Sequence, residues 1–259
     1  MTNIYFHCGG FWAMPHYIGA IEQLYKEYNK PNSKLDRNIK FYGNSAGGAW
    51  ALVCYLVLNG YAPVEQMKIK INKQFDKNRP LSHILTPIYC DLIDCIIPYM
   101  PPNLHSLVSG VLHIGVTTKD GFKFINEFKT NADIYNALLC SGTIAGCSNY
   151  VSILNDEACL DGAYMFKPEH IPEDTIIVAN STEIPKALTI PDYKSRITLR
   201  RKGKRQMKRY FRTGEQMPMI IHDCSPLYMK CAFWLHEIME KCPDWKKHLE
   251  KKTKSKITS

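Results

Sequence analysis

The sequence predicts one α/β domain with a mostly parallel central sheet covered by helices, and three observations support this fold class. Strand-like and helix-like segments alternate along the chain, which favours a parallel sheet with helical crossovers. The chain has 259 residues and 45% of them are apolar, so it can bury one sizeable core. Its longest apolar run, residues 49–58, is too short to span a bilayer.

The first elements follow a strand, helix, strand, helix order. Residues 3–7 read as a short strand, and residues 15–29 read as a helix that has Pro15 in its first turn and an apolar stripe on one side. Residues 39–43 form the second predicted strand. The next helix, residues 46–58, is apolar all round, which indicates that it is buried.

The rest of the chain continues this pattern with one gap. A helix over residues 63–75 precedes residues 79–110, which are rich in proline and receive no assignment. Further strands are expected at residues 111–118, 122–128, 150–156, 157–162 and 174–180, and further helices at residues 131–142 and 226–241. We expect residues 1–198 to form the domain and residues 199–259 to be a basic C-terminal extension whose helix packs on the same domain.

Positive charge is concentrated in two blocks. The formal net charge is +9, and the excess lies in residues 199–212 and 245–259. Such blocks suit an anionic membrane surface or nucleic acid, and a solvated loop with a frayed terminus is the alternative. Nucleic acid is the least favoured partner, because few aromatic residues are interleaved and no binding module is recognisable.

The cysteines and the N-terminus indicate an unsecreted protein. Ten cysteines are scattered with no CxxC pair, which argues against a zinc ribbon or a redox motif. The first residues lack a basic segment followed by an apolar run, so no secretory signal is predicted. We therefore expect reduced thiols that pack as small apolar residues.

The candidate nucleophile is Ser45, within Gly43-Asn44-Ser45-Ala46-Gly47. A Gly-x-Ser-x-Gly pentapeptide gains meaning where a strand leads in and a helix leads out, because the turn then lifts the hydroxyl above the strand end. Both conditions are predicted here. Gly43 and Gly47 have a steric reason, since strand and helix nearly touch at those positions. A structural tight turn is the alternative.

A nucleophilic serine also needs donors for the oxyanion that develops during attack. The backbone N–H of Ala46, the residue after the nucleophile, is one expected donor. Gly9 and Gly10, in a glycine-rich turn after the first strand, are the second expected source. An ordinary strand-to-helix turn at this position is the alternative.

A base must accept the serine proton, and the residues offer two kinds. His170, His222 and His236 follow Ser45 in the chain, but none has a distinctive setting. Asp161 follows a short strand and precedes Gly162, which would let it approach another segment. Exclusion of water would raise the pKa of such an aspartate and improve it as a base.

Four stretches in order together resemble the patatin-like phospholipase family, especially its adiponutrin and adipose triglyceride lipase branch. They are "IYFHCGGFW" with "YIGAIEQL", "FYGNSAGGAWAL", "DIYNALLCSGTIAG" and "ACLDGAY", and the resemblance covers roughly residues 3–180. Two departures stand out. Cys8, Gly9, Gly10 and Phe11 occupy the place of three glycines and a basic residue or a further glycine, and Ala145 replaces a proline.

The resemblance implies a three-layer α/β/α fold and a Ser–Asp dyad without histidine. Ser45 would be the nucleophile, Asp161 the base, and Gly9 and Gly10 the oxyanion loop, in a hydrolase of phospholipid or acylglycerol esters that needs neither a metal nor a cofactor. We expect an intracellular, cytoplasmic protein, peripheral on a membrane or a lipid droplet. A noncatalytic lipid-binding or scaffold protein on the same fold is the alternative.

Overall fold

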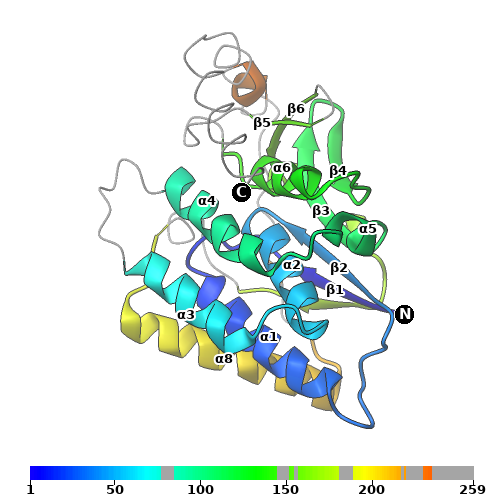
Figure 1. Ribbon diagram of the computed structural model, residues 1–259, viewed down its shortest axis with the longest axis vertical. Coiled ribbons are helices and arrows are strands. Elements are labelled where there is room, and N and C mark those ends of the chain that lie inside the picture. The colour runs from blue at the N-terminus through cyan, green and yellow to red at the C-terminus, as the bar shows by residue number, and fades with distance from the viewer. Residues whose placement is uncertain are drawn as a thin grey trace.

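The computed structural model describes residues 1–76, 85–144, 152–154, 157–180, 189–216, 219 and 230–234. It is an α/β protein with a mixed, mostly parallel central sheet flanked by helices (Figure 1). Among these residues the strands form one seven-stranded sheet with the pairing path β5-β6-β3-β2-β1-β7, and β4 also pairs with β3. The predicted fold class is confirmed at this level.

The parallel part of the sheet consists of four strands. They are β1 (Thr2–Phe6), β2 (Ile39–Asn44), β3 (Leu112–Thr118) and β7 (Thr175–Val178), and each neighbouring pair runs parallel. The antiparallel part consists of β4 (Gly121–Ile125), β5 (Ser152–Leu154) and β6 (Glu157–Asp161). All four parallel strands therefore end at the same edge of the sheet.

Side chains alternate strictly between the two faces of the parallel strands. Ile4 and Phe6 of β1, with Phe41 of β2, belong to the main core together with the helices. Tyr5 and Tyr42 point to the opposite face. There they form an aromatic layer with Phe122, Phe124 and Phe166, close to the 3₁₀ helix η3 (Pro168–His170).

The helices build the other side of the main core. α2 (Ala46–Leu58) is buried along its whole length against β1, β2 and β3, as its uniform apolarity predicted. Around it lie α1 (Met14–Tyr28), α3 (Val64–Phe75), α4 (Leu85–Ile96), α5 (Leu104–Val108) and α6 (Asn131–Ser141). The stretch 79–110, which the sequence left unassigned, thus includes α4, the 3₁₀ helix η2 (Ile97–Tyr99) and α5.

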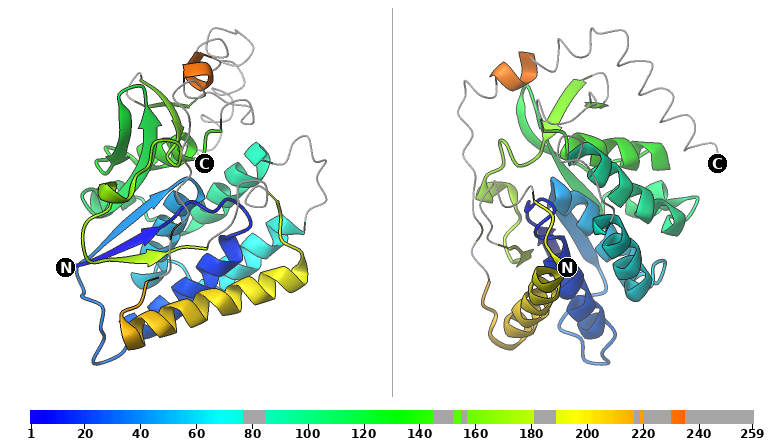
Figure 2. Two further views of the ribbon diagram at one scale, coloured as in Figure 1. Left: turned by 180° about the vertical axis from the view of Figure 1, so that it is seen from behind. Right: turned by 90° about the vertical axis from the view of Figure 1, so that its left-hand side faces the viewer.

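The basic block 199–212 lies in a helix, α8 (Tyr193–Thr213), and not in a solvated loop. Figure 2 shows α8 running alongside α1. Two glycines permit this close approach: a Cβ on Gly19 would lie 2.0 Å from the carbonyl oxygen of Arg200, and one on Gly203 would lie 2.0 Å from that of His16. α8 also spans residues 198 and 199, between which the sequence had placed the boundary of the extension.

Some expectations fall partly or wholly outside the described residues. Of the predicted strand 150–156 the structure describes 152–154, and of the predicted helix 226–241 it describes 230–234, which is helical. The basic tail 245–259 lies outside them. No helix in the described part of the chain is both long and apolar enough to cross a membrane.

Candidate active site

The turn between β2 and α2 holds Ser45 in an unusual backbone conformation. Its φ of 55° and ψ of −136° lie outside the regions that non-glycine residues favour. The neighbouring glycines allow the turn to close. A Cβ on Gly43 would lie 2.2 Å from the Gly47 carbonyl oxygen, and a Cβ on Gly47 would lie 2.1 Å from that of Phe6. The strand and the helix therefore come as close at both glycines as the sequence predicted, and backbone atoms leave no room for a side chain there.

The strand register brings the ends of β2 and β6 together. Gly115 of β3 pairs with Asn44 of β2 on one edge, and β4 occupies the other edge at the same position. Val116, the next residue of β3, pairs with Asp161 of β6, again with β4 on the other edge. β2 and β6 must therefore share one edge of β3. Because they run in opposite directions, their carboxyl ends face each other there.

Ser45 and Asp161 meet at this junction. The Ser45 hydroxyl donates a hydrogen bond to Asp161 Oδ2 at 2.7 Å. The second carboxylate oxygen, Oδ1, accepts from the Ala163 backbone N–H at 2.8 Å. The carboxylate is 3% exposed, and no cation pairs with it within the described residues. This is the arrangement in which a carboxylate can take a proton from a serine hydroxyl.

The environment of Asp161 changes its acidity. Burial raises the pKa of Asp161 from 3.8 to about 7, and the hydrogen bonds from Ser45 and from Ala163 N–H partly offset that rise. A group with this pKa is ionised for a large part of the time at neutral pH. It is also a stronger base than an ordinary aspartate, as the sequence argument required of a carboxylate base.

Two side chains that the sequence did not single out hold the backbone of Ser45. Ser141, at the end of α6, accepts from the Ser45 N–H at 2.8 Å and donates to the Gly115 carbonyl at 2.7 Å. The single O–H of Tyr89, on α4, is shared between the Leu138 carbonyl at 2.9 Å and the Ser45 carbonyl at 3.3 Å. The strained turn is thus fixed from α4, α6 and β3.

Asn44 connects the two halves of the site. Its side-chain amide donates to the Gly162 carbonyl at 3.2 Å, directly after Asp161. Its Oδ1 accepts from the Tyr5 hydroxyl at 2.7 Å, and that hydroxyl also lies 3.1 Å from His7 Nδ1. All of these groups are buried. Asn44 therefore links the strand before Ser45 to the loop after Asp161.

The glycine-rich turn follows β1 at the same edge of the sheet. The close approach of Phe6 to Gly47 places the end of β1 against the first turn of α2. From there the chain turns through Gly10, whose φ is 54°, and the Ala13 N–H donates to the Gly9 carbonyl at 3.2 Å. The N–H of Ala46 is the first of α2, where the helix itself provides no acceptor.

Of the three histidines weighed as alternative bases, the structure describes His170. The ring of His170 stacks on Phe122 at 4.6 Å, and its Nδ1 accepts from the Lys167 N–H, so it belongs to the aromatic face. His222 and His236 lie outside the described residues. No group of three or more His, Cys, Asp or Glu side chains gathers in metal-binding geometry in the parts of the chain that the structure covers.

The chain was compared with known proteins at the level of families, curated sequences and solved structures. No protein-family model matches it, no curated protein matches it, and no solved structure matches it. A function for this chain therefore has to be inferred from the geometry around Ser45 and Asp161.

Proposed function

We propose that the protein is a serine-type acyl hydrolase that uses Ser45 as nucleophile and Asp161 as base. The carrying observation is the 2.7 Å hydrogen bond from the Ser45 hydroxyl to a buried carboxylate, made across a strained strand-to-helix turn. A structural turn gains nothing from a buried, uncompensated carboxylate, whereas a nucleophile requires a base.

The proposed reaction proceeds through an acyl-enzyme. Asp161 takes the hydroxyl proton as Ser45 Oγ attacks the ester carbonyl, and the Ala46 N–H with the Gly9–Gly10 turn stabilises the oxyanion. The tetrahedral intermediate collapses, the ester bond breaks, and the proton passes to the leaving alcohol. Water, deprotonated by Asp161, then attacks the acyl-enzyme; as the bond between the acyl group and Ser45 Oγ breaks, Asp161 returns the proton to Oγ and the fatty acid leaves.

The proposed substrates are phospholipids or acylglycerols, and the proposed fold is the three-layer patatin-like arrangement. Support comes from the four stretches of the sequence resemblance and from where the structure puts them. The glycine-rich turn, the Ser45 turn, Ser141 and Asp161 all lie around the carboxyl end of β2. The altered turn at Cys8 to Phe11 does not disturb the Ser45–Asp161 contact.

A peripheral site on an anionic membrane is proposed for α8. The helix carries ten lysines and arginines and no acidic residue. Five of its exposed cations recur at helical spacing and form a stripe about 27 Å long: Lys194, Arg201, Arg205, Lys208 and Arg212. Co-sedimentation with anionic and neutral vesicles over a salt series tests this proposal. Binding that is absent, or that does not weaken as salt rises, contradicts it.

Hydrolysis of phospholipid and acylglycerol esters tests the enzymatic proposal. The purified protein is compared with Ser45→Ala and Asp161→Asn, and with the matched controls Ser106→Ala and Asp120→Asn at exposed positions. We expect activity in the wild type and both controls, and its loss in both site variants. Equal rates in all five proteins would refute the proposal.

A noncatalytic lipid-binding or scaffold protein is the second candidate. The observation that favours it is the glycine-rich turn, where Phe11 and Ala13 are buried and the Tyr17 hydroxyl donates to the His7 carbonyl. This packing ties the turn to α1. A fluorophosphonate probe separates the two candidates, because covalent labelling of Ser45 requires an activated hydroxyl and an open approach to it.

A further inference from the structure

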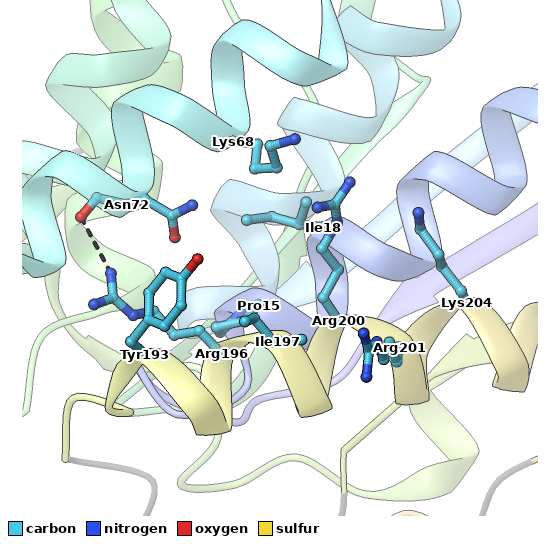
Figure 3. Close-up of a pocket in the computed structure, with 10 residues that line it drawn as sticks. All are labelled: Pro15, Ile18, Lys68, Asn72, Tyr193, Arg196, Ile197, Arg200, Arg201 and Lys204. Carbon is cyan, nitrogen blue, oxygen red and sulfur yellow. Dashed lines mark hydrogen bonds between the residues drawn. The ribbon is translucent and has the colours of Figure 1, made fainter.

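A pocket lined by residues of three helices lies at the contact of α8 with α1 and α3. It encloses about 420 Å³ and shares no residue with the Ser45 site. α1 contributes Pro15 and Ile18, α3 contributes Lys68 and Asn72, and α8 contributes Tyr193, Arg196, Ile197, Arg200, Arg201 and Lys204 (Figure 3). Such a concave site, built from separate parts of the chain, has the form of a ligand site.

The lining of this pocket, hereafter the α8 pocket, is strongly cationic. Five of its ten residues are lysine or arginine and none is acidic. Three carboxylates outside the lining pair with four of these cations: Glu22 with Arg200 and Lys204, Glu65 with Lys68 and Arg200, and Asp76 with Arg196. Five cations against three carboxylates leave an excess of two positive charges, which fits a dianion.

Two arginines have donors to offer. Arg196 is held by Asp76 at 2.6 Å and by the Asn72 carbonyl at 3.4 Å, while its Nε is buried and has no partner among the described residues. Arg201 is exposed and makes no ion pair within that part of the chain. A buried guanidinium N–H without a partner is costly, and the exposed guanidinium of Arg201 is the donor that an anionic oxygen in the pocket can reach.

The remaining lining residues are apolar or aromatic. Pro15 and Ile18 come from the first turns of α1, and Ile197 and Tyr193 stand on the exposed side of α8, with Tyr193 72% exposed. A bare inorganic anion would make no favourable contact with these apolar and aromatic side chains. An anion attached to carbon atoms can cover it and gain the free energy of apolar burial.

We propose that the α8 pocket binds a dianionic phosphate group attached to an organic moiety, either a soluble phosphomonoester or a phosphomonoester lipid headgroup. This inference does not rest on the proposed hydrolase activity, because the pocket is separate from Ser45 and Asp161. It also differs from attraction of α8 to a membrane by surface charge, since it requires particular residues and not the sum of charges.

Calorimetric titration of the full chain with glycerol 3-phosphate, at fixed ionic strength, tests the proposal. Arg201→Gln removes a pocket cation, and Arg205→Gln is its matched control, because Arg205 is also exposed on α8 but does not line the pocket. We expect Arg201→Gln to weaken binding about tenfold, since it removes one charged hydrogen bond, and Arg205→Gln to change little. Ile197→Trp should also weaken binding by narrowing the pocket without changing its charge.

The pH dependence provides an independent reading. The second pKa of a phosphomonoester is about 6, so affinity should rise between pH 5 and 7 as the dianion forms. Absence of binding by the wild type overturns the proposal. Equal weakening by Arg201→Gln and Arg205→Gln also overturns it, because general surface charge would then explain the effect.

Vesicles distinguish the two sources of the phosphate group. Phosphatidylcholine vesicles with phosphatidic acid are compared with phosphatidylserine vesicles of equal surface charge. A preference for phosphatidic acid that Arg201→Gln removes and Arg205→Gln keeps assigns the pocket to a lipid headgroup. Binding of glycerol 3-phosphate without this preference assigns it to a soluble ligand.

Discussion

Two buried carboxylates in this molecule have opposite surroundings. Glu22 of α1 is held by Arg200 Nε at 3.0 Å and by Lys204 Nζ at 2.7 Å, so its charge is compensated by cations from α8. Asp161 is equally buried, but its described partners are a serine hydroxyl and one backbone N–H. Glu22 fastens α8 to α1, whereas Asp161 is kept uncompensated, which costs stability and suits a base.

The largest expected difference between the two carboxylates is in catalysis. Asp161→Asn should lower kcat/KM for ester hydrolysis by about 10³-fold or more, because an amide cannot accept the Ser45 proton. Glu22→Gln should leave kcat/KM within a few fold as long as the protein is folded. Steady-state kinetics at pH 8 measure both, and similar losses in the two variants would contradict the assignment of roles.

The second difference is the pH dependence of stability. The folded-state pKa of Asp161, about 7, lies above its ordinary 3.8, so its ionisation destabilises the fold increasingly between pH 4 and 7. Asp161→Asn should therefore raise the free energy of unfolding, by roughly 2 to 3 kcal/mol more at pH 8 than at pH 5. Urea unfolding at the two pH values measures this. A gain that does not change with pH would show that Asp161 is not the perturbed group.

Glu22→Gln should change the free energy of unfolding in the opposite direction to Asp161→Asn. Its loss leaves Arg200 and Lys204 without their shared carboxylate, and both side chains are about one third exposed, which moderates the cost. We expect the free energy of unfolding to fall by about 2 kcal/mol. Urea unfolding of Glu22→Gln beside Glu215→Gln, whose partner Arg209 is exposed, provides the comparison. Equal effects would mean that burial of Glu22 adds nothing.

Adjacent glycines test the turn that brings Ser45 to Asp161. Gly47→Ala would place a Cβ 2.1 Å from the Phe6 carbonyl oxygen and should cost roughly 2 kcal/mol or more. Gly48→Ala meets its nearest atoms at 3.4 Å and should be neutral or stabilising by up to about 1 kcal/mol. Thermal unfolding measures the stability of the two variants, and a Gly47→Ala variant as stable as the wild type would disprove the tight contact.

The smallest effect concerns Asn44, which links Tyr5 to the Gly162 carbonyl. Asn44→Ala should lower kcat about tenfold with KM little changed, because Asp161 loses part of its positioning. Asn44→Asp keeps the acceptor for Tyr5 but loses the amide donor, so it should not restore activity. Full activity in Asn44→Ala would show that Asn44 does not position Asp161.

Short patterns with their own steric logic made Ser45 and Asp161 candidates, the residues alone left a histidine base open, and the family resemblance is what paired the two. Strand, turn and helix place the serine, and the glycine after Asp161 allows a close approach: a Cβ on Gly162 would lie 2.1 Å from the Gly115 carbonyl oxygen. These constraints are local, so one sequence can reveal them. The edge that β2 and β6 share is not local, and only the register of β3 shows it.

The supporting contacts were beyond sequence reasoning. Tyr89 lies in the stretch that received no assignment, and Ser141 looked like any residue at the end of a helix, although it lies in one of the stretches of the resemblance. For α8 a signal was present: Leu199, Gly203, Met207 and Phe211 recur every four residues and are all buried. The many lysines and arginines between them led the sequence analysis to treat this segment as a basic block and not as an amphipathic helix.

The central claim is that Asp161 activates the Ser45 hydroxyl. Its most direct test is the rate at which a fluorophosphonate modifies Ser45 between pH 5 and pH 9, with intact-mass spectrometry as the measurement of that rate. The account predicts a single adduct on Ser45 whose rate rises with pH around a midpoint of about 7, the pKa of Asp161, and is abolished in Asp161→Asn. Labelling elsewhere, no labelling of Ser45, or an undiminished rate in Asp161→Asn would contradict it.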